Sequence, residues 1–165
     1  MNDAHLHMVV NHFPIIGLIF GTCILVVVIV LKNKSVQNTA FILLAIAAIF
    51  GFASMATGEG AEEIVEDFPN VGKKIIHEHE ELAETFVLFL YATGLLALIS
   101  LVLNLKNNAK VKFVIYATLV VSIVTCVFAK SVGTSGGEIR HTEIRESNNQ
   151  TNNTALDSKK ENDED

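Results

Sequence analysis

The sequence predicts an all-α fold: a four-helix transmembrane bundle with a short amphipathic surface helix and a disordered acidic C-terminal tail. Half of the 165 residues are hydrophobic, the mean hydropathy is +0.43, and the charged residues gather in a few places. The apolar residues therefore form blocks, each close to the 20 or so residues that a helix needs to cross a bilayer. In lipid such a block must be helical, because a helix satisfies its own backbone hydrogen bonds.

The four apolar runs define a membrane domain over residues 1–146. They cover residues 13–31, 36–57, 85–105 and 111–129. Pro14 should kink the first helix near the membrane interface. The second run is rich in Ala, Gly and Ser, which let helices approach closely in lipid, so it should pack inside the bundle.

Two segments between and after these runs are polar. In residues 58–70, Ile64, Val65 and Phe68 recur at helical spacing among acids, which predicts a short amphipathic helix on the membrane surface. Asn, Thr, Asp, Glu and Lys dominate residues 147–165, with almost nothing apolar, which predicts a disordered tail.

Charge sets the expected orientation and excludes some partners. Short lysine-bearing connections without acids follow the first and third runs, so the positive-inside rule places both in the cytoplasm. We therefore expect a multi-pass protein of the bacterial inner (cytoplasmic) membrane with both termini outside. The net charge of -6 argues against nucleic acid as a partner. Cys23 and Cys126 lie inside apolar runs and are expected to be buried thiols without a disulfide.

This topology brings all the histidines to the outer side of the membrane. They are His5, His7, His12, His77, His79 and His141. At 3.6 residues per turn His5 and His12 share one helix face and His7 is turned away. His77 shares a face with glutamates, whereas His79 lines up with Ala83 and Phe86 on a stripe that points into the bundle.

Three interpretations of these histidines remain open. The first is a non-covalent haem b held by two imidazoles from facing helices, with His12 and His79 as the natural pair and His7 or His141 as substitutes. The haem propionates would then be expected to pair with Arg140, Lys73 or Lys74. The second is a transition-metal ion held by histidines and carboxylates, and the excess of acids on this side suits a bare cation. The third is structural: interfacial histidines that hold no ligand.

The candidate residues for these sites overlap. The haem-binding candidates are His7, His12, His79 and His141. The metal-ion candidates are His12, His77, His79, Glu59, Glu62 and Glu138. No Cys-x-x-Cys-His attachment motif is present, so any haem is non-covalent. No acid/base or nucleophile set is visible, and we expect no enzyme activity from the chain on its own.

Several short motifs resemble an uncharacterised family of bacterial four-helix integral membrane proteins that is classed as a domain of unknown function. They are His7, His12-Phe13-Pro14, Thr57-Gly58, His79 and Gly136-Gly137-Glu138-Ile139-Arg140-His141. Met8 stands where the family has its first Pro, and the spacing to His141 is compressed. The resemblance covers about residues 5–141. Relatives lie near Rieske or cytochrome c modules, which implies a respiratory redox partner.

From the residues and this resemblance we expect a redox or electron-transfer subunit in the lipid bilayer that binds haem b or a metal at its outer face. The alternative is a structural or assembly subunit that binds no cofactor and works through helix packing.

Overall fold

The structure, a computed structural model, describes residues 2–69, 71–141 and 143–145. The described chain is helical and contains α1 (Asp3–Val10), α2 (His12–Leu31), α3 (Lys34–Val65), α4 (Lys73–Leu105) and α5 (Val111–Arg140). Four helices, counting α1 and α2 as one, are long and apolar enough to cross a membrane. The four-helix bundle predicted from the apolar runs is confirmed, and the tail over residues 147–165 lies outside the described residues.

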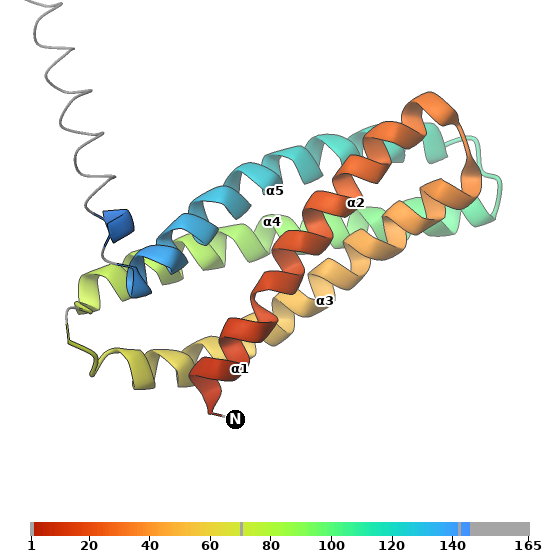
Figure 1. Cartoon of the computed structure of the whole chain (residues 1–165). Helices are drawn as coiled ribbons and strands as arrows, with labels where there is room; N and C mark the ends of the chain where they lie inside the picture. Colours follow the sequence, from red (N-terminus) through yellow and green to blue (C-terminus); the bar gives the residue numbers. More distant parts are fainter. Residues whose placement is uncertain (1, 70, 142, 146–165) are drawn as a thin grey trace, which may run out of the picture.

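The helices run antiparallel in chain order (Figure 1). The α2–α3 and α4–α5 turns lie together at one end, which we call the lysine end (Lys32, Lys34, Lys106, Lys110 and Lys112). The opposite end holds α1, the end of α3, the start of α4 and the end of α5, and we call it the histidine end. Each helix packs on its neighbour in sequence, α5 returns to α2, and α1 lies on α3.

A single helical break separates α1 from α2. Pro14 cannot donate to the carbonyl of Val10, and its ring crowds that carbonyl, so the helix is interrupted at Asn11. The predicted kink is confirmed. It frees α1 to follow α3 instead of continuing the axis of α2.

Small residues let the helices of the core approach closely. Ala40, Ala47, Ala48 and Gly51 are buried on α3, so the expected interior position of the second run is confirmed. A Cβ atom on Gly94 of α4 would lie 2.5 Å from the Cβ of Ala48. Large side chains point outward instead, as lipid allows: Phe20, Val30 and Phe113 are 62%, 77% and 79% exposed.

Hydroxyl pairs join α4 to α5 inside the bundle. Thr93 and Thr125 are 2.9 Å apart, and Ser100 and Thr118 are 3.0 Å apart. Each hydroxyl has one proton, so in each pair one hydroxyl donates to the other, and the second donates to a carbonyl of its own helix, as Thr118 does to Val114 and Thr125 does to Val121. These groups are therefore satisfied without water. Such bonds hold membrane helices in register where lipid offers no polar alternative.

In one detail the structure differs from the prediction. Residues 58–65 do not form a separate surface helix but continue α3 to Val65. The reason is packing: α1 covers this extension, with Asp3 against Gly60 and Ala61 buried. Ile64 and Val65 are half-buried, whereas Phe68, beyond the end of α3, is exposed. The extended α3 brings its polar end beside α1.

Candidate functional site

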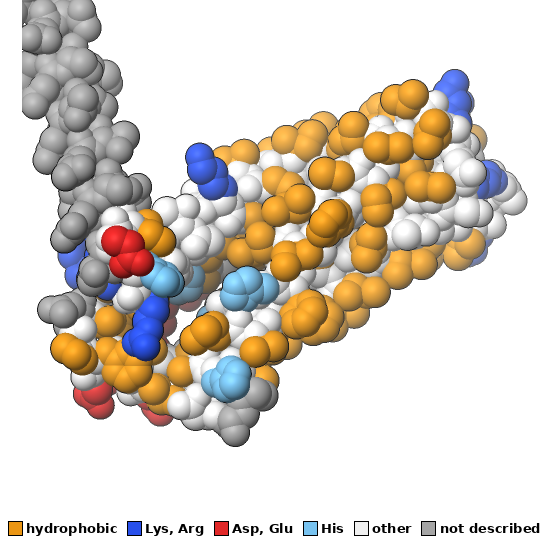
Figure 2. All heavy atoms as spheres, viewed as in Figure 1, with side chains coloured by type: hydrophobic (Ala, Val, Ile, Leu, Met, Phe, Trp, Pro, Cys, Tyr) orange, Lys and Arg blue, Asp and Glu red, His pale blue; other side chains and the backbone are white. Residues whose placement is uncertain are grey.

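The histidine end combines α1 on α3 with α4 on α5. Figure 2 shows a hollow on this end of the molecule, with histidine side chains at its edges. Two of the six histidines, His7 and His79, are partly buried there, while His5, His12, His77 and His141 are exposed. The partly buried pair comes from the first and fourth helices.

His7 is held by the polar end of α3. Its Nδ1 lies 3.1 Å from the main-chain oxygen of Ser54 and 3.1 Å from Oγ1 of Thr57. The Ser54 carbonyl can only accept, so Nδ1 carries the proton and donates it. Gly58 lies beside this ring, since a Cβ there would be in ordinary contact with Cε1 of His7 at 3.8 Å. The ring is thereby fixed in one tautomer.

His79 is held in the same way by α5. Its Nδ1 lies 2.9 Å from Oγ of Ser135, and Ser135 donates its own proton to the carbonyl of Val132 at 3.1 Å. The hydroxyl has one proton, so His79 is the donor to Ser135. A Cβ on Gly136 would lie 3.1 Å from Cε1 of the ring, which packs directly on that glycine. His79, like His7, keeps Nε2 without a proton.

Burial keeps both rings neutral. It lowers the pKa of His7, although the bond to Ser54 opposes the effect. It also lowers the pKa of His79, and the nearby His7 lowers that pKa further. The two rings are therefore close enough to influence one another, and no hydrogen bond to Nε2 of either is found among the described residues. Two neutral imidazoles that donate through Nδ1 and have a free Nε2 lone pair have the form in which histidine can bind a metal.

The other candidate histidines are placed differently. His12 is exposed, and its Nδ1 donates to the Met8 carbonyl at 2.7 Å. His77 is exposed and lies 3.7 Å and 3.4 Å from carboxylates of Glu80 and Glu81, which confirms its predicted face. The inward stripe of His79 is confirmed too, because Phe86 is buried and Ala83 is partly buried.

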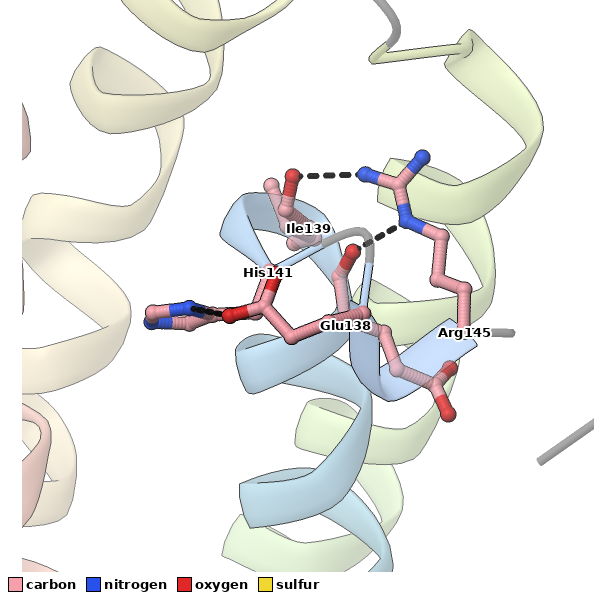
Figure 3. Close-up of polar contacts among 5 residues, drawn as sticks. Glu138, Ile139, His141 and Arg145 are labelled. Atoms are coloured by element: carbon pink, nitrogen blue, oxygen red, sulfur yellow. Dashed lines mark hydrogen bonds and ion pairs between the residues drawn. The ribbon is translucent and has the colours of Figure 1, made fainter. Parts of the chain in front are cut away.

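The end of α5 carries the last candidate histidine. His141 pairs with Glu143 at 2.9 Å on the surface. Arg145 turns back and donates to the main-chain oxygens of Glu138 and Ile139 (Figure 3). Both carbonyls belong to the last turn of α5, so the guanidinium caps this helix. His141 therefore belongs to a capping segment at the surface.

The candidate carboxylates do not assemble around a histidine. Glu59 is exposed and Glu138 partly buried. Glu62 of α3 instead meets Glu80 of α4, and the shared hydrogen bond and charge repulsion raise the pKa of Glu62. Within the described residues no group of three or more His, Cys, Asp or Glu side chains is arranged to hold a metal ion.

The cations proposed for propionates all lie at this end. The guanidinium of Arg140 stacks 5.2 Å from the centre of the Phe68 ring. Lys73 lies 3.3 Å from Glu66, and Lys74 lies 3.6 Å from Glu78, as exposed pairs. Exposed pairs of this kind are weak, so these cations remain available to another anion.

The residues that hold the two rings were not candidates from the sequence. They are Ser54, Thr57 and Ser135, together with the glycines Gly58 and Gly136. The sequence does carry a signal for them, since hydroxyl and glycine residues stand side by side at the polar ends of the second and fourth apolar runs. The helix pairing needed to connect them to His7 and His79 is visible only in three dimensions.

Comparison with known proteins supports the membrane assignment. Residues 4–143 match the family described as "Predicted membrane protein (DUF2231)". Neither the curated proteins nor the solved structures contain a significant match. The matched region covers α1 to α5 and both partly buried histidines, and the chain belongs to the DUF2231 family of membrane proteins.

Proposed function

We propose that this integral membrane protein is an electron-transfer subunit that holds one haem b, without a covalent link, between His7 and His79. We further propose that it lies in the bacterial inner membrane with both termini outside and serves a respiratory redox partner. The observation that carries the proposal is the matched pair of neutral rings at the histidine end, each bonded through Nδ1 and open at Nε2.

The chemistry of this donor set fits haem. Imidazoles that ligate metals nearly always donate their second nitrogen to a carbonyl, carboxylate or water, which fixes the tautomer and the ring orientation. His7 does this with the Ser54 carbonyl, and His79 does it with the Ser135 hydroxyl. When bound, haem would supply a one-electron iron couple, while the two rings hold it in place and the surrounding helices limit access of water.

Two ligands are enough for haem but few for a bare ion. Haem would bring porphyrin nitrogens to its own iron, so the protein would need to add only two ligands, which His7 and His79 would supply. A structural zinc ion instead takes about four protein ligands. The lack of a three-ligand group in the described residues therefore favours haem over the ion that His12, His77, Glu59 and Glu138 would share with His79.

A structural subunit without cofactor is the second candidate, and one observation favours it. Each partly buried ring also fastens two helices together: His7 joins α1 to α3, and His79 joins α4 to α5. The same bonds would serve a bundle whose only role is to support a partner. The crowd of carboxylates near Glu62 and Glu80 also suits an anionic haem less well than a neutral or cationic ligand.

An absorption spectrum of the detergent-purified protein after haem titration tests the proposal. We expect a Soret band and a sharp reduced α-band, both lost in His7→Ala and in His79→Ala. The exposed His5→Ala and His12→Ala variants should keep the bands. Retention in His7→Ala with loss in His12→Ala would transfer the ligand role to His12. A spectrum without these bands at saturating haem, together with no metal by elemental analysis, would contradict the haem proposal and support the structural subunit.

A further inference from the structure

A second concave site lies on the outer side of α4 and α5 at the histidine end. This α4–α5 groove has a volume of about 450 Å³. It is lined by Leu82, Val127, Lys130, Ser131, Thr134, Ser135 and Glu138. Apart from Leu82 on α4, these residues come from α5. The proposed haem site uses only Ser135 among them, through its bond to His79.

The α5 residues of the groove are ordered by polarity along the helix. Val127 and Ser131 are one turn apart, as are Lys130 and Thr134, so they form two adjacent rows facing the groove. Val127 lies within the apolar run that ends at residue 129, and Lys130 is the first charge after it. Glu138 follows eight residues later, about 12 Å further from the membrane centre. Moving outward, the groove is apolar, then cationic with hydroxyls, then anionic.

This order matches one class of membrane molecule. In a zwitterionic phospholipid the acyl chains are followed outward by the phosphate and then by the ammonium group. Lys130 lies at headgroup depth, and lysine side chains there extend toward the interface. Ser131 and Thr134 add hydroxyl donors at the same level, and Glu138 provides a carboxylate where the ammonium would lie.

We propose that the α4–α5 groove binds a phospholipid with a primary ammonium headgroup, a phosphatidylethanolamine. Lys130, Ser131 and Thr134 bind its phosphate, Glu138 binds its ammonium, and Val127 contacts the start of an acyl chain. An anionic lipid such as phosphatidylglycerol has no ammonium group to interact with Glu138. A choline lipid has no N–H to donate to that carboxylate. The inference is independent of haem, since it uses neither Nε2 atom.

Lipid binding to the intact protein, measured by native mass spectrometry from detergent, tests this. We expect phosphatidylethanolamine to bind more strongly than phosphatidylglycerol or phosphatidylcholine. Lys130→Gln should weaken both phosphatidylethanolamine and phosphatidylglycerol, by about fivefold for the loss of one exposed charge pair. Glu138→Gln should weaken phosphatidylethanolamine alone. Matched controls at exposed charges outside the groove, Lys112→Gln and Glu63→Gln, should change neither.

Three results would overturn the proposal. Equal binding of the three lipids would indicate only the ordinary shell of surrounding lipid. Unchanged headgroup preference in Glu138→Gln would remove the ammonium site. If glycerophosphoethanolamine, which lacks acyl chains, displaced phosphatidylethanolamine completely, the groove would be a site for a soluble headgroup and not for a lipid. A Leu82→Trp variant, which fills the groove without changing a charge, should also lower phosphatidylethanolamine binding while the melting temperature is maintained.

Discussion

Ser135 accepts a hydrogen bond from Nδ1 of His79 at 2.9 Å while donating its own proton to the Val132 carbonyl. The hydroxyl thus sets the tautomer of the ring from the neighbouring helix. In the same way, the Ser54 carbonyl of α3 sets the tautomer of His7. The tautomers of both rings therefore depend on the packing of neighbouring helices.

Replacing Ser135 by Ala should weaken haem binding without abolishing it. His79 would lose the partner that fixes its ring, and loss of such a partner typically costs about 10–100-fold in affinity. The measurement is a haem titration followed at the Soret band. Ser131→Ala, exposed one turn earlier on α5, is the matched control and should titrate like the unchanged protein. Equal affinities for the two variants would contradict a positioning role for Ser135.

Acid should destabilise the protein through its two partly buried rings. Their pKa values are lowered from 6.5 by burial, so below that pH the unfolded chain takes up protons that the folded chain resists. Stability is fully present above pH 6.5 and falls as the pH drops through the lowered values. The raised pKa of Glu62 acts in the opposite direction. Thermal unfolding in detergent should show a smaller acid loss in a His7→Gln, His79→Gln double variant, and an unchanged loss would count against burial of the rings.

Neutralising Glu62 should stabilise the protein at neutral pH. The pKa of Glu62 is raised chiefly by the hydrogen bond and the repulsion with Glu80, so the folded protein disfavours the charged carboxylate. The resulting loss of folding stability grows as the pH rises through the raised pKa. For an exposed pair, Glu62→Gln should gain at most about 1 kcal/mol. The gain should vanish below pH 4.5, and exposed Glu63→Gln should give none. A loss of stability at pH 8 would contradict the pairing.

The buried Thr93–Thr125 pair should contribute modestly to stability. Thr93→Val keeps the shape but removes the bond between α4 and α5. Thr125 retains its bond to the Val121 carbonyl, so no group is left without a partner. Bonds between membrane helices average about 0.6 kcal/mol, and we expect a loss of that size in denaturant unfolding from mild detergent. Thr85→Val, exposed on α4, is the control.

Two glycines with opposite surroundings should respond oppositely to alanine. Gly94→Ala places a methyl group 2.5 Å from the Ala48 side chain, which forces α3 and α4 apart and should cost about 1–3 kcal/mol. Gly133→Ala meets only Ile15, at 3.9 Å, and should stabilise α5 by up to about 1 kcal/mol through helix propensity. Comparable melting temperatures for the two variants would contradict the close approach of α3 and α4.

The membrane fold followed from the sequence because it depends on quantities local to each run. The ends of the first and third runs at Leu31 and Leu105 coincide with the ends of α2 and α4, since lysines and asparagines stop an apolar helix. The helix of the second run continues past residue 57, where the apolar run itself ends. Glycines and acids after Thr57 suggested a new element, but packing against α1 extends α3 to Val65.

The partly buried pair of histidines was harder to predict because one helix face had to be chosen. Helical spacing separated His7 from His5 and His12, and the structure has His7 partly buried and the other two exposed. The favoured partner for His79 was nevertheless His12, which stands nearer the apolar run. The break at Asn11 determines which histidine is partly buried, because it lets α1 lie on α3. No local sequence pattern predicts the direction that α1 takes after the break.

His7 and His79 enter the bundle from α1 and α4, so they are synthesised at different times. A chain still on the ribosome exposes His7 early, with the hydroxyl and carbonyl of α3 following it. The second ring arrives with α4, and its serine partner arrives last, on α5. A chain that stops before α4 therefore has His7 without His79, and one that stops after α4 but before Ser135 has both rings but lacks that serine. Any molecule that needs both rings in place must wait for the finished protein.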